Sequence, residues 1–131
     1  MSACVATTAG ERRLGSDDGD GRTAKIRTLN DAFRCGIPRT GGNTRLILTD
    51  GVGSLPPAQL ASIVGLVRTF AEFTPDNDPH GEHDFGAVEH DSVRYFWKID
   101  AYDRWMQFGS PDPTDPTVTT RVLTIMRADE Y

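Results

Sequence analysis

The stretch VRYFWKIDA, residues 93–101, decides the fold, because apolar and polar side chains largely alternate along it. One set of alternate positions is apolar or aromatic throughout: Val93, Tyr95, Trp97 and Ile99. The positions between them are Arg94, Phe96, Lys98 and Asp100. Successive side chains of a strand point to opposite faces of a sheet, so this pattern predicts a β-strand with one buried face. Lys98 and Asp100 share the other face, where they can form an ion pair.

The segments on either side of this strand predict a C-terminal β-meander. Asp91 and Ser92 form a two-residue connection, which predicts a hairpin with the short apolar run at residues 87–89. Two further strands are expected at about 105–108 and 118–127, separated by a proline-rich connection.

The first half of the chain predicts two helices and one more strand. Apolar residues at helical spacing and the stop signal Gly36 predict a helix over about 24–35. The run RLILT, residues 45–49, is mostly apolar, which predicts a strand inside the sheet with apolar contacts on both faces. Pro57 suits the first turn of a second helix over about 57–73.

The length of 131 residues is that of one domain. Residues 1–22 are rich in Gly, Ser, Thr and charge, which predicts a disordered N-terminal tail before a single domain over residues 23–131. The expected fold class is α+β, with two helices packed on one face of a mainly antiparallel sheet of four to five strands.

Composition excludes several classes of partner. A formal net charge of −5 disfavours direct binding to DNA or RNA, although it is compatible with a basic protein partner. No apolar run approaches the length of a membrane span. Cys4 and Cys35 have no spacing typical of a zinc site or a disulfide framework, which predicts two free thiols and a cytoplasmic location.

The segment DNDPHGEHD, residues 76–84, is the main candidate for a functional site. It holds four carboxylates and two imidazoles without a lysine or arginine: Asp76, Asp78, Glu82, Asp84, His80 and His83. The four carboxylates are candidates for contact with a basic partner. A divalent transition metal bound by His80, His83, Asp84 and Asp100 is the alternative, since imidazole and carboxylate together suit such ions.

Other interpretations of this segment are structural. As a calcium loop it fails at the twelfth position, where Ala87 stands in place of a bidentate glutamate. The same side chains can instead cap turns, accept hydrogen bonds from loop amides, or pair with Arg94 and Lys98. The chain has no nucleophile elbow, no P-loop and no complete dinucleotide-binding motif.

Three stretches carry a resemblance to a known family. They are FTPDNDPHGEHDFG at residues 73–86, FWKIDAYD at 96–103 and VTTRVLTIMRADEY at 118–131. Over about residues 23–131 the chain resembles the bacterial domain-of-unknown-function family 3768. The resemblance implies a small accessory protein of plasmids and other mobile elements, encoded in some cases near anti-restriction genes, and it implies no chemistry or cofactor.

These observations lead to two expectations of function. The first is a non-enzymatic protein-binding accessory factor, such as an anti-defence inhibitor of the anti-restriction or anti-CRISPR type that binds a basic nucleic-acid-binding host protein. The second is a small metal-dependent enzyme that uses the acidic and histidine-bearing segment 76–84. The absence of a complete catalytic set favours the first.

Overall fold

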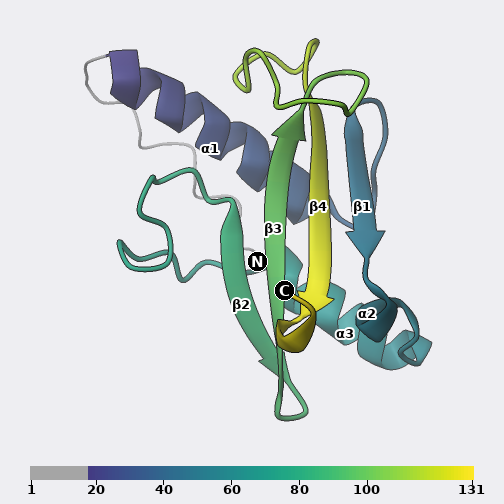
Figure 1. Cartoon of the computed structure of the whole chain (residues 1–131). Coiled ribbons are helices and arrows are strands. Elements are labelled where there is room, and N and C mark those ends of the chain that lie inside the picture. Colours follow the sequence, from purple (N-terminus) through teal and green to yellow (C-terminus); the bar gives the residue numbers. More distant parts are fainter. Residues whose placement is uncertain (1–17) are drawn as a thin grey trace.

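The strand predicted from the alternating stretch is β3 (Val93–Tyr102), and it lies inside a four-stranded sheet. The computed structural model describes residues 18–131. The strand order is β1-β4-β3-β2, and all four strands are visible in Figure 1. Tyr95, Trp97 and Ile99 are buried on one face of β3, which confirms the prediction from the alternation.

The predicted hairpin is present and joins β2 (Phe85–His90) to β3. Asp91 and Ser92 adopt φ angles of 53° and 65°, the positive values that a two-residue type I′ turn requires. The last strand, β4 (Thr120–Arg127), pairs antiparallel with β3 and completes the meander.

The sheet is mixed rather than wholly antiparallel, because β1 (Thr44–Leu48) pairs parallel with β4. The prediction that this strand lies inside the sheet is wrong, since β1 is an edge strand. Leu46 and Leu48 pack against the core, while Ile47 between them is 43% exposed. A short apolar run does not distinguish an interior strand from an edge strand, because that choice depends on where β4 pairs.

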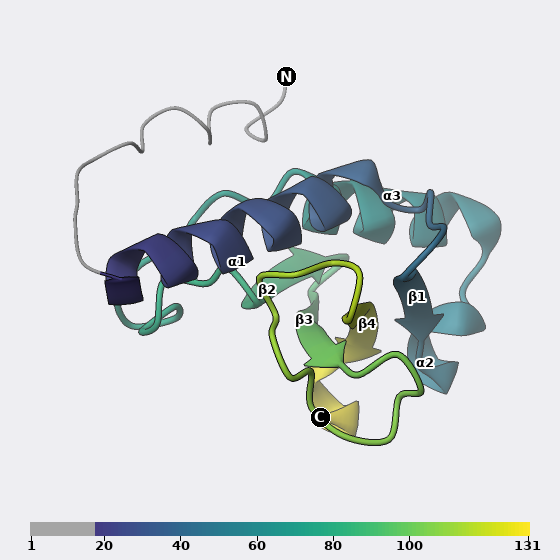
Figure 2. The same ribbon diagram turned by 90° about the horizontal axis from the view of Figure 1, so that it is seen from above.

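The two long helices cover the same face of the sheet, as predicted, and Figure 2 shows both on one side of the strands. Helix α1 (Asp18–Gly36) begins earlier than predicted, so residues 18–22 are helical although their two glycines favoured a tail. Residues 1–17, the rest of the predicted tail, lie outside the described part of the chain. Helix α3 (Pro57–Arg68) is shorter than predicted.

Two further segments differ from the prediction. A short helix, α2 (Asp50–Gly53), follows β1 directly and was not predicted. Residues 105–108, predicted as a strand, form turns that lead to an isolated bridge between Tyr102 and Gly109, so the sheet has four strands and not five. The chain ends in a 3-10 turn, η3 (Ala128–Glu130), which lies on the side of the sheet away from the helices (Figure 2).

The core lies between α1, α3 and the sheet, and Trp97 is its largest fully buried side chain. Gly86 stands opposite Trp97 in the β2–β3 pairing. A Cβ atom at Gly86 would lie 2.5 Å from the Nε1 atom of Trp97, so only glycine leaves room for the indole. This close approach gives a physical reason for a glycine inside a strand, where the residue is otherwise unfavourable.

The cysteine at the end of α1 differs from its prediction. Cys35 is disulfide-bonded, so the predicted free thiol is wrong for this residue, while Cys4 lies outside the described residues. Structural disulfides are typical of oxidising compartments. The cytoplasmic location therefore stays a prediction. No helix in residues 18–131 is long and apolar enough to cross a membrane.

Candidate functional site

The acidic segment 76–84 forms a loop between α3 and β2 and lies beside α1 (Figure 1). Thr74 and Asn77 close its first turn: the Asn77 Oδ1 atom accepts the Thr74 amide at 3.0 Å, and the Thr74 Oγ1 atom accepts the Asn77 amide at 3.3 Å. Two of its residues, Gly81 and His83, have positive φ angles of 70° and 55°. The segment thus has a defined conformation that turns particular side chains towards α1.

His83 is held between two carboxylates. Its Nδ1 atom lies 2.9 and 3.1 Å from the two carboxylate oxygens of Asp31 on α1. Its Nε2 atom lies 3.6 Å from Asp78 Oδ2, and the His83 amide donates to Asp78 Oδ1 at 3.2 Å. The ring also stacks on Phe73, with centroids 3.6 Å apart and planes 4° from parallel. Both imidazole nitrogens therefore face protein carboxylates rather than an open metal position.

Arg34 extends this group into the core. Its Nη2 atom donates to Asp31 Oδ1 at 3.1 Å. Its Nη1 atom donates to three carbonyl oxygens at the C-terminal end of α3 and beyond, those of Val67, Arg68 and Phe70, at 3.0, 3.0 and 2.9 Å. These carbonyls lack the partners that a continuing helix would supply. Burial lowers the pKa of the Arg34 guanidinium, and the carboxylate of Asp31 opposes that effect.

The guanidinium of Arg34 also lies between two aromatic rings. Its Cζ atom is 5.5 Å from the ring centroid of Phe73 and 5.3 Å from that of Trp97, within the range of a cation–π contact. Sequence reasoning missed both Asp31 and Arg34. The available signal was an oppositely charged pair at positions i and i+3 of a predicted helix, with Ala32 and Phe33 between them.

A cavity of about 280 Å³ lies on the other side of the acidic segment, between α1, the start of β2, the end of β3 and the loop before β4. Its lining is mixed: Arg22, Ile26, Asn30, Glu82, Asp84, Ile99, Asp100, Ala101, Pro113 and Arg121. Burial raises the pKa of Glu82, and the nearby charge of Asp84 raises it further. Burial also raises the pKa of Asp84, with the charge of Asp78 as the next cause.

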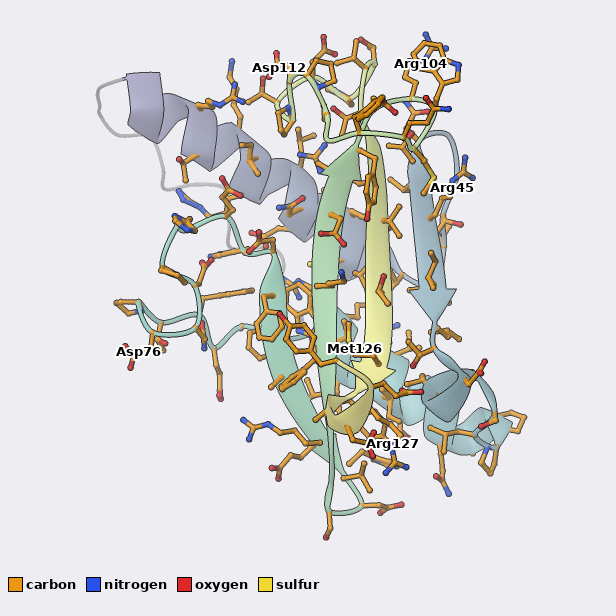
Figure 3. The ribbon with its side chains drawn as sticks, in the orientation of Figure 1. Arg45, Asp76, Arg104, Asp112, Met126 and Arg127 are labelled. Carbon is orange, nitrogen blue, oxygen red and sulfur yellow. The ribbon has the colours of Figure 1, made fainter. Side chains whose placement is uncertain are left out.

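The residues predicted as a partner-binding acidic surface are not arranged as one surface. Asp76 is exposed and lies at the outer tip of the loop in Figure 3. Asp78 is buried against His83, whereas Glu82 and Asp84 line the cavity. Of the four carboxylates, Asp76 is the one whose residue is exposed and can contact a large partner.

The residues predicted as metal ligands are likewise divided. Asp84 and Asp100 line the same cavity, but His83 faces Asp31. Asp100 forms the predicted ion pair with Lys98, at 3.0 Å, which confirms that expectation. Within residues 18–131, no group of three His, Cys, Asp or Glu side chains is arranged to hold a metal ion.

A second candidate site is the loop of residues 103–109, which we call the aromatic loop. Trp105 and Phe108 are 71% and 72% exposed. The loop is nevertheless ordered by hydrogen bonds, because Asp103 Oδ1 accepts the amides of Trp105 and Gln107, both at 3.0 Å. The Asp103 amide donates to the Phe108 carbonyl at 2.8 Å. The sequence analysis predicted a separate strand over these residues, whereas the structure has turns there.

Comparison with known proteins supplies a family and no activity. The family model "Protein of unknown function (DUF3768)" matches residues 48–130. The matched region runs from the last residue of β1 to the end of η3 and does not include α1. No curated protein and no solved structure matches the chain. The match covers more than half of the sequence and includes the acidic segment, the aromatic loop and three of the four strands in full. The chain therefore belongs to the DUF3768 family of proteins of unknown function.

Proposed function

We propose that this chain is a non-enzymatic protein-binding domain whose contact surface is centred on the aromatic loop. The observation that carries the proposal is the exposure of Trp105 and Phe108. Large aromatic side chains dominate the binding energy of protein interfaces, and Trp is among the residues most enriched at their energetic centres. Each ring would contribute roughly 2–3 kcal/mol if it were fully removed from water.

The order of the aromatic loop supports this proposal. Binding loses free energy when flexible side chains and loops become fixed, so a surface that is already ordered binds more tightly. Asp103 holds the loop through its hydrogen bonds to two amides. Arg104 adds a cation–π contact, with its Cζ atom 5.5 Å from the ring centroid of Trp105. The two exposed rings are thus presented in a defined position.

The charges near the loop indicate the chemistry of the partner. Arg104 and Arg45 are exposed and lie at the same end of the sheet, as Figure 3 shows. The surface fits a protein with an apolar cleft that has acidic side chains at its rim. Binding of a basic nucleic-acid-binding host protein through the acidic segment remains a prediction, and it depends mainly on Asp76.

The biological setting that we propose is inhibition of a bacterial defence system by a mobile element. It rests on the kind of accessory protein that the family resemblance implies, and on a small domain with an exposed aromatic contact surface. Under this proposal the partner is a protein component of the defence system rather than its nucleic acid.

The test compares variants in a quantitative capture experiment with bacterial lysate. The double variant Trp105→Ala/Phe108→Ala is expected to lose, by about tenfold or more, the partner that the unchanged protein retains. Tyr131→Ala is the matched control, because Tyr131 is 76% exposed but lies outside the aromatic loop. Equal capture by the double variant, or loss only in Asp76→Asn, would overturn the proposal in favour of the acidic segment.

A small metal-dependent enzyme remains the second candidate. The observation that favours it is a pair of half-buried carboxyl groups, Glu82 and Asp84, whose pKa values are raised beside a cavity, since such shifts are concentrated at catalytic sites. Elemental analysis of the untagged protein tests it. A metal present at one equivalent and lost in Asp84→Asn would favour the enzyme.

A further inference from the structure

The cavity beside the acidic segment has an arginine with unused binding capacity. Arg121 is only 4% exposed. Its Nε atom donates to Asn30 Oδ1 at 2.8 Å, and its Nη2 atom donates to the Pro113 carbonyl at 2.5 Å. Both acceptors are neutral. No carboxylate in residues 18–131 forms an ion pair with Arg121, and its Nη1 atom has no hydrogen bond there.

A buried guanidinium without a counter-ion is unusual. Burying a charge is unfavourable unless an opposite charge or several hydrogen bonds compensate it. Burial lowers the pKa of Arg121, and the negative charge of Glu82 opposes that effect from a distance greater than an ion pair. The cavity therefore offers a cationic donor group that could hold an anion.

The same cavity is lined by two carboxylates that also lack an ion-pair partner among the described residues. The side chains of Glu82 and Asp84 form no ion pair with a described residue. Burial is the largest cause that raises both pKa values, followed by neighbouring carboxylates, while the charges of His80 and, at Glu82, Arg22 oppose this effect without forming an ion pair. Two other charges of the cavity are already compensated: Asp100 pairs with Lys98 at 3.0 Å, and Arg22 pairs with Asp112 at 3.2 Å.

The third feature of the cavity is apolar. Ile26, Ile99 and Ala101 contribute to its lining. A volume of about 280 Å³ lies at the lower end of the range for small-molecule sites, so a ligand must be small. An aliphatic group of a few carbon atoms would fit against these three side chains.

We propose that this cavity binds a small aliphatic zwitterion of the amino-acid type. Arg121 holds the carboxylate of the ligand, Glu82 and Asp84 hold its ammonium group, and the aliphatic part lies against Ile26 and Ile99. Such a ligand supplies each unpaired charge of the cavity with an opposite charge. Hydrogen bonds between charged groups are about twice as strong as neutral ones, and a water-poor site strengthens them.

The experiment is isothermal titration calorimetry of the full chain with valine and with two fragments of it. Isovalerate keeps the carboxylate and lacks the ammonium group, whereas isobutylamine keeps the ammonium group and lacks the carboxylate. Valine is expected to bind in a saturable manner at one site, at least tenfold more tightly than either fragment. The same titration with leucine and alanine tests the size of the apolar region.

Two nearly isosteric variants show where the ligand binds. Glu82→Gln and Asp84→Asn are each expected to weaken binding of valine by about tenfold or more, while thermal unfolding shows that both variants remain folded. Asp76→Asn is the matched control, because Asp76 lies in the same acidic segment but is exposed and does not line the cavity, and its affinity should equal that of the unchanged protein. Absence of binding by all three amino acids at about 10 mM, or equal binding by a fragment or by Asp84→Asn, would overturn the proposal.

Discussion

Replacement of Arg34 with methionine should be among the most destabilising single changes in this domain. Methionine is similar in length and can keep the contacts with Phe73 and Trp97, so the change removes the charge and the hydrogen bonds while it preserves most of the packing. The three acceptors at the end of α3 lose their donor, and Asp31 loses its arginine partner.

The magnitude follows from these losses. Removal of one partner from a buried ion pair destabilises a protein by about 3–5 kcal/mol. A buried carbonyl without a donor costs about 1–3 kcal/mol, but the Val67 carbonyl, whose hydrogen bond to Arg34 is buried, still accepts the Phe70 amide at 3.2 Å, so this loss adds little. His83 remains beside Asp31 and offsets part of the loss. We expect Arg34→Met to lower the free energy of unfolding by about 4 kcal/mol.

Urea unfolding followed by circular dichroism measures this change. Arg34→Lys keeps the charge but cannot reach all four acceptors, so it should lose about half as much. Arg94→Met is the matched control, because Arg94 makes only a cation–π contact with Phe96 and is exposed, and we expect a change of at most about 0.5 kcal/mol. A loss below about 1 kcal/mol for Arg34→Met would show that the buried charge makes no net contribution and refute the reasoning.

Four further substitutions test other parts of the structure. Asp84→Asn and Glu82→Gln should each raise the free energy of unfolding at pH 7, because the raised pKa of each carboxyl group means that its ionisation opposes folding. The gain should disappear as the pH falls below the ordinary pKa values of 3.8 for Asp84 and 4.5 for Glu82. Unfolding measured at several pH values tests this expectation. Gly86→Ala should lower stability by about 2 kcal/mol, because the new Cβ atom meets the Trp97 ring, and a neutral result in urea unfolding would contradict that contact. Hydrogen bonds lower the pKa of Glu130, so its ionised form stabilises the fold above pH 4.5, and this effect decreases as the pH falls through the lowered pKa. Glu130→Gln should therefore lower the midpoint of thermal unfolding more at pH 7 than at pH 3, and an equal effect at both would exclude a role for its charge.

Prediction from the sequence was most accurate where neighbouring residues decide the structure. The alternation in β3 identified its buried face, and the pair Asp91–Ser92 identified the hairpin, because both patterns act over a few residues. The same reasoning overextended the sheet at Trp105, where the backbone turns after Asp103 accepts two local amides. An aromatic run alone does not show whether its rings are buried.

The candidate site could be located but not described in advance. The composition of residues 76–84 drew attention to this segment, since it combines carboxylates and imidazoles without lysine or arginine. The contacts that hold this segment come from α1, where Asp31 binds His83 and where Asn30 donates to the carbonyl of Glu82 at 3.0 Å. Neither contact is visible in a local pattern, because each joins residues 52 positions apart.

The sequence by itself determined the α+β class, the β-hairpin and the buried face of β3, because periodicity and turn chemistry are local properties of the chain. Only the tertiary structure decided that β1 is a parallel edge strand, that Arg34 stabilises the end of α3, and that Arg121 lines the same cavity as Glu82 and Asp84. Arg121 and Asn30 are 91 positions apart, so their contact exists only once α1 has packed against the sheet. The charge of a side chain is encoded locally, whereas the presence or absence of its partner is a property of the folded chain.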